Sequence, residues 1–372
     1  MSNLRRTLIK INGSAGVSPY LRLLALLALL YIFFVSISLM GASFKFFGKD
    51  FAKHLLETTS DPFVGLFIGI LATSLVQSSS TTTSMTVALV AGGGLDVTNA
   101  IPIIIGANVG TSVTNTLVSL GHIGRSDEFR RAFAAATVHD FFNLLAVLVL
   151  FPLQLATNFL GKIASFLAVE FADIGGFKLF NVLKVVVTPS VKAITSLTHE
   201  TGWLMLTVSV ILLFVALRYI VVNLKAVVIG KVEQFFSSTL FKNDGRSFSL
   251  GLVLTVMVQS SSITTSLAVP LAGAGILTLR QIFPMTLGAN VGTTITAILA
   301  ALVTGEVAAL TVAFAHLLFN VIGIVILWPI KRVPIGLAER LSAAAQKSKL
   351  IPAAYILLVF FALPLLFIWI VG

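Results

Sequence analysis

Long apolar runs, separated by short polar and basic segments, dominate the pattern of this chain. Seven of the runs have a length near that of one bilayer, about 20 residues at 1.5 Å per helical residue. They are predicted to be membrane-spanning helices over residues 23–40, 101–120, 132–155, 203–222, 280–303, 307–330 and 351–371. Because the runs are continuous rather than alternating, they exclude a membrane β-barrel. The pattern predicts an all-α polytopic membrane protein.

A further apolar stretch, at about residues 62–95, contains a polar break. The break is the segment QSSSTTTS at residues 77–84. A helix in lipid satisfies its own backbone, but it cannot find partners for eight consecutive polar side chains spread around its circumference. We therefore expect two half-helices that form a hairpin and meet at a polar tip, which faces water or a ligand inside the protein.

The break occurs a second time. The segment QSSSITTS at residues 259–266 lies 182 residues after the first and predicts a second hairpin at about 248–276. Downstream, GANVGT occurs at 106–111 and again at 288–293, with the same spacing. Two polar helix breaks at corresponding places in two halves are typical of the binding site of a secondary transporter.

The number of crossings predicts how the halves are oriented. Each half has three crossings if its hairpin counts as none, and an odd number requires the second half to be inverted. The basic segments 121–131, 223–246 and 331–349 then lie on one side, which the positive-inside rule makes cytoplasmic. The predicted fold is two inverted-topology repeats, each with a re-entrant hairpin and an interrupted transmembrane helix. The predicted boundaries are a cytoplasmic N-terminus at 1–19, repeat 1 at 20–157, an interfacial connection at 158–201, repeat 2 at 202–330, a cytoplasmic loop at 331–350 and a terminal transmembrane helix at 351–372.

The composition supports the membrane interpretation. Apolar residues make up 57% of the chain and charged residues 10%, and the mean hydropathy is +1.03. A net charge of +11 would indicate nucleic acid as a partner for a soluble protein, but here the basic residues fall in short clusters between apolar runs, so we exclude that partner. The chain has no cysteine, which excludes disulfides and thiolate metal sites.

The polar tips carry hydroxyl and amide groups and no charged side chain. Hydroxyl, amide and carbonyl oxygens suit a hard monovalent cation such as Na⁺, whereas hydroxyl and amide donors at half-helix N-termini suit an oxyanion. The tips therefore predict cation-coupled uptake of a small oxyanion. Asn108 and Asn290 are expected to line the same site, because an amide in the middle of a span is costly without a partner.

Asp140, His139 and His316 are ionisable residues that lie within predicted spans. Asp140 has no acidic counterpart in the second half, and we favour a pair with His139, Arg130 or Arg131 over a functional role. His139 and His316 are expected to form hydrogen bonds within the bundle, since no second ligand lies at a chelating distance in the sequence. No transition-metal site and no cofactor are predicted.

At these residues the sequence resembles the type II sodium-dependent phosphate cotransporter family. The resemblance rests on the two QSSS motifs, on GANVGTSVTNT at 106–116 and on FRRAFAAATVHDFFN at 129–143, and it covers roughly 20–330. It implies Na⁺-driven uptake of inorganic phosphate by alternating access. The glycosylated, cysteine-containing loop between the halves of animal members is absent, which suits a bacterial member in the cell inner membrane.

The resemblance also implies site residues, carried over by motif position. The implied phosphate ligands are Gln77, Ser78, Ser79, Ser80, Gln259, Ser260, Ser261, Ser262, Asn108 and Asn290. The implied sodium ligands are Ser80, Thr81, Thr82, Asn108, Thr111, Ser262, Thr264, Thr265, Asn290 and Thr293.

Several alternatives stay open from the sequence. Within transport, the chain could carry or export phosphate or another small oxyanion, such as sulfate, arsenate or a dicarboxylate. An oxygen-lined channel and an intramembrane serine hydrolase belong to other classes; the symmetric duplication of the serines argues against the hydrolase. The expected partners are phosphate, Na⁺ and the lipid bilayer, with a homodimer left open.

Overall fold

The structure is a computed structural model that describes residues 19–44, 46–47, 57, 59–235, 241 and 243–371. The predicted N-terminal segment 1–19 lies almost entirely outside these residues. The described helices are α2 (Pro19–Phe44), α4 (Pro62–Val76), α5 (Ser79–Ala91), α6 (Val97–Gly110), α7 (Val113–Leu120), α8 (Ser126–Thr157), α9 (Phe159–Asp173), α10 (Gly176–Leu197), α11 (Gly202–Phe235), α12 (Asp244–Val258), α13 (Ser261–Gly273), α14 (Leu279–Thr304), α15 (Val307–Leu327), α16 (Arg332–Lys347), α17 (Leu350–Leu357) and α18 (Leu363–Val371). A short π-helical turn, Leu358–Ala362, joins the last two.

Within the described part of the chain, seven segments are long and apolar enough to cross a membrane. They are Tyr20–Phe44, Val97–Leu120, Ser126–Thr157, Gly202–Asn223, Leu279–Thr304, Val307–Leu327 and Leu350–Val371. Each coincides with one of the seven predicted runs. This confirms the prediction of an all-α polytopic protein, and the chain is a multi-pass membrane protein.

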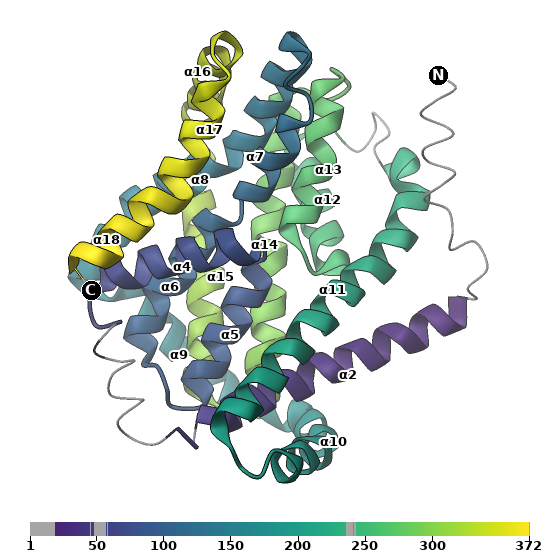
Figure 1. The fold of residues 1–372 in the computed structure, drawn as a ribbon, viewed down its shortest axis with the longest axis vertical. Coiled ribbons are helices and arrows are strands. Elements are labelled where there is room, and N and C mark those ends of the chain that lie inside the picture. Colours follow the sequence, from purple (N-terminus) through teal and green to yellow (C-terminus); the bar gives the residue numbers. More distant parts are fainter. Residues whose placement is uncertain are drawn as a thin grey trace.

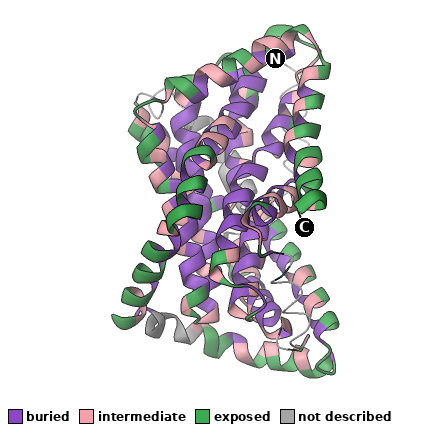
Figure 2. Cartoon of the chain, turned by 90° about the vertical axis from the view of Figure 1, so that its left-hand side faces the viewer, coloured by how far each residue is buried: buried purple, intermediate pink, exposed green. Residues whose placement is uncertain are grey.

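The helices differ in how deeply they lie in the bundle (Figures 1 and 2). In the spans formed by α6–α7 and by α14, 78% of the most apolar stretch is buried, against 33% in the span of α11 and 17% in the terminal span. The two interior spans carry the repeated GANVG segment. The less buried helices expose large apolar side chains, as expected for surfaces that face lipid.

Glycines bring the central helices into close contact at two equivalent crossings. At Gly106, where α6 crosses α4, an added Cβ would lie 1.9 Å from the carbonyl oxygen of Leu66. At Gly288, where α14 crosses α12, it would lie 1.9 Å from the carbonyl oxygen of Phe248. Only glycine permits this approach of the two backbones, as in other small-residue helix contacts in membranes. The glycine spacing therefore serves packing in both halves.

The predicted helix interruption is present in the first half only. Helices α6 and α7 are separated at Thr111 and Ser112, whereas α14 runs continuously through the equivalent positions, with Pro284 inside it. A side-chain difference accompanies the change. Asn115 of α7 reaches across the bundle and donates to Thr265 at 2.8 Å, while the equivalent position in α14 is Ala297, which has no such group. The expectation of an interrupted helix in the second half was wrong.

Two predicted connections are helical. The segment 158–201 forms α9, which packs on α15, and α10, which packs on α2 and α14. The segment 331–350, predicted as a loop, contains α16, which packs along α8. The buried residues of α16 recur at helical spacing and give the helix an apolar face. These buried residues are Pro334, Ile335, Ala338, Ser342 and Ala345, and the basic residues of α16 lie outside this face.

Two contacts place three basic segments of the chain close together. The Gln346 side chain at the end of α16 donates to the Ser126 hydroxyl at the start of α8, with N and O 2.9 Å apart. Lys331 forms an ion pair with Asp244 at the start of α12. The starts of α8 and α12 therefore both contact the segment 331–346.

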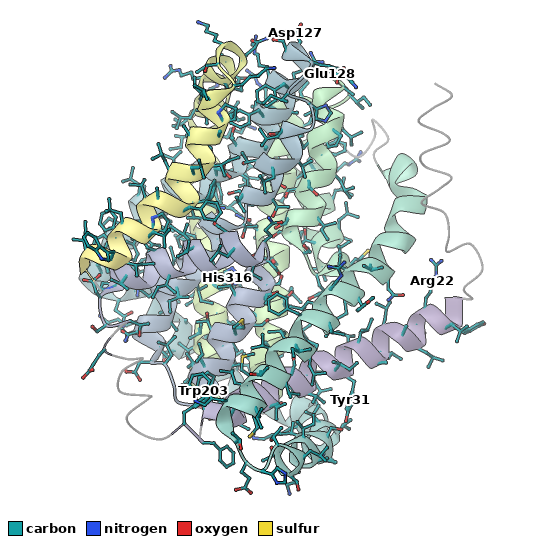
Figure 3. The ribbon with its side chains drawn as sticks, in the orientation of Figure 1. Arg22, Tyr31, Asp127, Glu128, Trp203 and His316 are labelled. Atoms are coloured by element: carbon teal, nitrogen blue, oxygen red, sulfur yellow. The ribbon has the colours of Figure 1, made fainter. Side chains whose placement is uncertain are left out.

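A labelling experiment tests whether these segments share one side of the membrane. The chain has no native cysteine, so Ser126→Cys and Ser348→Cys should be labelled by an impermeant thiol reagent from the same side only. Thr201→Cys is the control, because Trp203 lies at the opposite end of the molecule from Asp127 (Figure 3); it should be labelled from the other side. Labelling of Ser126→Cys and Ser348→Cys from opposite sides would contradict the inverted-repeat topology.

Candidate functional site

Each polar tip begins with a glutamine in an unusual backbone conformation. Gln77 ends α4 with φ 56° and ψ 29°, and Gln259 ends α12 with φ 56° and ψ 27°. Both lie in the left-handed region, which a residue other than glycine adopts at a cost of about 1–2 kcal/mol. In each, the backbone N–H donates to a threonine carbonyl four residues earlier at 2.7 Å. The chain thus stops the helix sharply at the glutamine.

The next serine starts the second helix of each pair. Ser78 and Ser260 are extended, with φ −150° and −154°, and each caps the following helix. Their hydroxyls accept hydrogen bonds from the backbone N–H groups of Thr81 and Ile263, at 3.2 and 3.4 Å. Serine is a preferred N-cap because its oxygen satisfies an N–H that the helix leaves free. The QSSS sequence therefore encodes the break itself: a left-handed C-cap followed by a serine N-cap.

Hydrogen bonds link each tip to the opposite half. The Ser80 hydroxyl lies 3.1 Å from that of Thr293 and donates to the carbonyl oxygen of Gln259 at 3.2 Å. Ser262, the equivalent of Ser80, donates to the carbonyl oxygen of Thr111, the equivalent of Thr293, at 3.3 Å. Each tip therefore contacts the GANVGT segment of the opposite half.

A cavity of about 590 Å³ lies between the tips and α11. Seven of the predicted site residues line it: Gln77, Ser78, Ser80, Thr81, Gln259, Ser260 and Ser262. Val76, Thr114 and Ile263 add to the wall on the side of the tips. The cavity is thus bounded by hydroxyl and amide groups from both copies of the QSSS motif.

Other predicted site residues are buried behind this cavity and do not line it. These are Ser79, Ser261, Thr82, Thr264, Thr265, Thr111 and Thr293. Several of their hydroxyls donate within their own helix: that of Thr264 to the Ser260 carbonyl at 3.1 Å and that of Thr111 to the Ala107 carbonyl at 2.9 Å. The Ser261 hydroxyl is buried and has no hydrogen-bond partner among the described residues.

Asn108 and Asn290 are also buried and do not line the cavity. The Asn290 side-chain oxygen lies 2.6 Å from Nε2 of His139, and its amide donates to Asn143 at 2.9 Å. The Asn108 side-chain oxygen lies 3.3 Å from Nε2 of His316. Each asparagine therefore pairs with a histidine of the other half, which satisfies the costly mid-span amide.

These contacts bear on hydrolase chemistry and on metal binding. His316 lies in the interior of the bundle (Figure 3), and in the described structure neither His139 nor His316 forms a hydrogen bond with a serine of a tip. A serine hydrolase requires that nucleophile–base contact. Among the described residues, no group of three His, Asp or Glu side chains could hold a metal ion. The two histidines hydrogen-bond within the bundle, as the sequence predicted.

Asp140 has a different partner from those expected. It is fully buried on α8 and accepts a hydrogen bond from the Tyr355 hydroxyl of α17 at 2.9 Å. Arg131, one of the predicted partners, donates instead to the Gly273 carbonyl at the end of α13, at 2.6 and 3.0 Å. The predicted pair was wrong because Tyr355 comes from the terminal span, 215 residues away and outside the duplicated region.

Apart from Val76, Thr114 and Ile263, the lining residues that the sequence analysis missed come from α11. Phe214, Arg218, Tyr219 and Val222 line the cavity opposite the tips. Helix α11 contacts both α5 and α12, so it closes the side that the two helix pairs leave open. One signal in the sequence could have found this wall: Arg218 is the single charged residue in the span 202–223.

The fold and the cavity define a multi-pass helical membrane protein in which two copies of one polar helix break face a common cavity. The Na⁺/Pi-cotransporter family model matches residues 32–178 and 212–338. The chain therefore belongs to the Na⁺/Pi-cotransporter family. No solved structure gives a significant match.

Curated relatives support the same assignment. The chain is 33% identical to sodium-dependent phosphate transport protein 2B of Homo sapiens, over 92% of this chain and 64% of that protein. It is 33% identical to sodium-dependent phosphate transport protein 2A of Ovis aries, over 94% of this chain and 67% of that protein. The chain thus spans about two thirds of the length of these relatives.

Proposed function

We propose that this protein is a secondary transporter that couples the movement of inorganic phosphate to that of Na⁺. Membership of the Na⁺/Pi-cotransporter family and the names of the relatives support this substrate pair. The observation that carries the proposal is the cavity bounded by both QSSS tips. Its hydroxyl and amide groups offer donors to an oxyanion and oxygen ligands to a hard cation.

The proposed binding site is shared by the two halves. Each tip forms a hydrogen bond with the GANVGT segment of the opposite half, Ser80 with Thr293 and Ser262 with Thr111. A ligand between the tips would interact with groups from both halves, and a rocking movement of one half against the other would open the site to either side. The α4–α5 and α12–α13 pairs then act as re-entrant hairpins of two inverted repeats whose tips meet near the middle of the bilayer.

In this mechanism, co-bound Na⁺ compensates part of the negative charge of the anion. The tips contribute no cationic side chain, so a phosphate dianion held there needs positive charge from elsewhere. The N-termini of α5 and α13, which begin at the tips, supply part of it through their partial positive charge. Na⁺ bound beside the anion supplies a further part, and the two ligands thereby favour each other's binding.

Uptake of radiolabelled phosphate into proteoliposomes tests the proposal. We expect saturable uptake that requires an inward Na⁺ gradient and stops when K⁺ or choline replaces Na⁺. Sulfate and arsenate as competitors identify the anion that the site prefers. Uptake driven equally well by K⁺ or by protons alone would contradict Na⁺ coupling, and flux without saturation would indicate a channel.

A further inference from the structure

The wall of the cavity opposite the tips contains a positive charge. Among the described residues that line the cavity, Arg218 of α11 is the only one with a charged side chain. The remaining α11 residues in this wall are apolar, apart from the hydroxyl of Tyr219. The composition of the tips alone therefore understates the electrostatic potential inside the cavity.

The position of Arg218 makes a merely structural role difficult to support. It is the single charge in an apolar span whose mean hydropathy is 2.5. An arginine in a span is costly and normally pairs with a carboxylate, faces a water-filled cavity or extends to the membrane surface. The Arg218 side chain is exposed, and no carboxylate among the described residues forms an ion pair with it.

We propose that Arg218 is the anion-attracting residue of the cavity, drawing the oxyanion from water toward the two QSSS tips. The identity of that anion as phosphate rests on the proposed function; the effect of Arg218 on the charge of the cavity does not. A charged group in a cleft with low-dielectric walls raises the local concentration of a counter-ion. Guanidinium also matches the geometry of phosphate oxygens, which favours arginine over lysine at such a position.

The charge of the cavity is measured without reference to transport. In the chain without native cysteine, Ile263→Cys places one thiol on the cavity wall, at a tip residue with no polar side chain. Its rate of reaction is compared for an anionic and a cationic methanethiosulfonate reagent of similar size. Arg218→Gln is expected to lower the anionic-to-cationic rate ratio by about fivefold or more, because the two rates respond in opposite directions to one lost charge.

A matched charge loss provides the control. Arg280→Gln removes an arginine that is exposed and does not line the cavity, and it should leave the ratio unchanged. An unchanged ratio in Arg218→Gln, or a thiol at position 263 that reacts with neither reagent, would overturn the proposal. Either result would mean that Arg218 extends to lipid headgroups or that the cavity is closed to water.

Phosphate transport then tests the role of the charge. Arg218→Gln is expected to raise the phosphate concentration for half-maximal uptake about fivefold to tenfold and to weaken its dependence on ionic strength. Arg218→Lys should recover part of this loss. A lowered reagent ratio with an unchanged phosphate dependence would overturn the role of Arg218 in anion attraction. A lowered ratio in a protein whose wild type transports no phosphate would support the charged cavity and contradict the proposed function.

Discussion

Ser80→Ala and Ser262→Ala are each expected to raise the phosphate or Na⁺ concentration for half-maximal uptake by about fivefold to a hundredfold. Both serines line the cavity, and their hydroxyls contact the opposite half, at Thr293 and at Thr111. Each substitution removes one hydroxyl from a polar cavity, and a hydrogen bond to a charged ligand contributes about 1.5–3 kcal/mol. These half-maximal concentrations are obtained from initial rates of uptake in proteoliposomes, measured over a range of phosphate and Na⁺ concentrations.

The double mutant separates one shared site from two independent sites. If Ser80 and Ser262 serve one set of ligands, their effects should be non-additive. Ser84→Ala is the matched control, because the Ser84 hydroxyl is buried in α5, has no partner in the part of the chain that the structure describes, and belongs to a residue that does not line the cavity. Uptake by this variant should stay near the wild-type rate. Strictly additive effects, or wild-type kinetics in either single mutant, would count against a shared site.

Gly288→Ala is expected to destabilise the fold by about 3 kcal/mol or more. The added methyl group would lie 1.9 Å from the carbonyl oxygen of Phe248, a backbone atom that cannot turn away as a side chain would. Relief of this overlap requires α12 and α14 to separate, which costs packing along the whole crossing. The equivalent substitution Gly106→Ala meets the Leu66 carbonyl at the same distance and should have a similar effect.

The measurement is the fraction of monodisperse protein that survives heating in detergent, because membrane proteins of this size often unfold irreversibly. Gly336→Ala is the matched control: an added methyl group meets nothing within 4 Å, and alanine favours the helix that glycine weakens. It should equal or exceed the wild type in stability. A Gly288→Ala protein as stable as the wild type would show that the two helices can move apart without cost.

The features that sequence predicted best are local ones. The seven spans follow from the length and continuity of apolar runs, since lipid demands helices that satisfy their own backbone. The helix breaks at Gln77 and Gln259 follow from a polar segment that lipid cannot accept, and the structure gives both breaks the same backbone. The exact spacing of the two copies predicted that both halves would use the same residues.

The predictions that failed concern pairings between distant segments. The duplication suggested an interrupted helix in both halves, but Asn115 has no counterpart in α14, where Ala297 stands. Asp140 was assigned a partner near it in the chain, whereas its partner Tyr355 comes from the terminal span. Neither a motif nor a hydropathy pattern predicts which side chains of distant helices contact each other in a bundle.

The sequence by itself determined the class of protein, the two polar tips and the glycines that let the helices approach, because each depends on a few neighbouring residues and on the solvent. Only the tertiary structure decided which tip residues line the cavity and that α11 closes it with Arg218. Those features depend on contacts between segments more than a hundred residues apart, such as Ser80 with Thr293. They are fixed by the packing of the whole bundle, in which one residue type lines the cavity at one position and forms a hydrogen bond inside the protein at another.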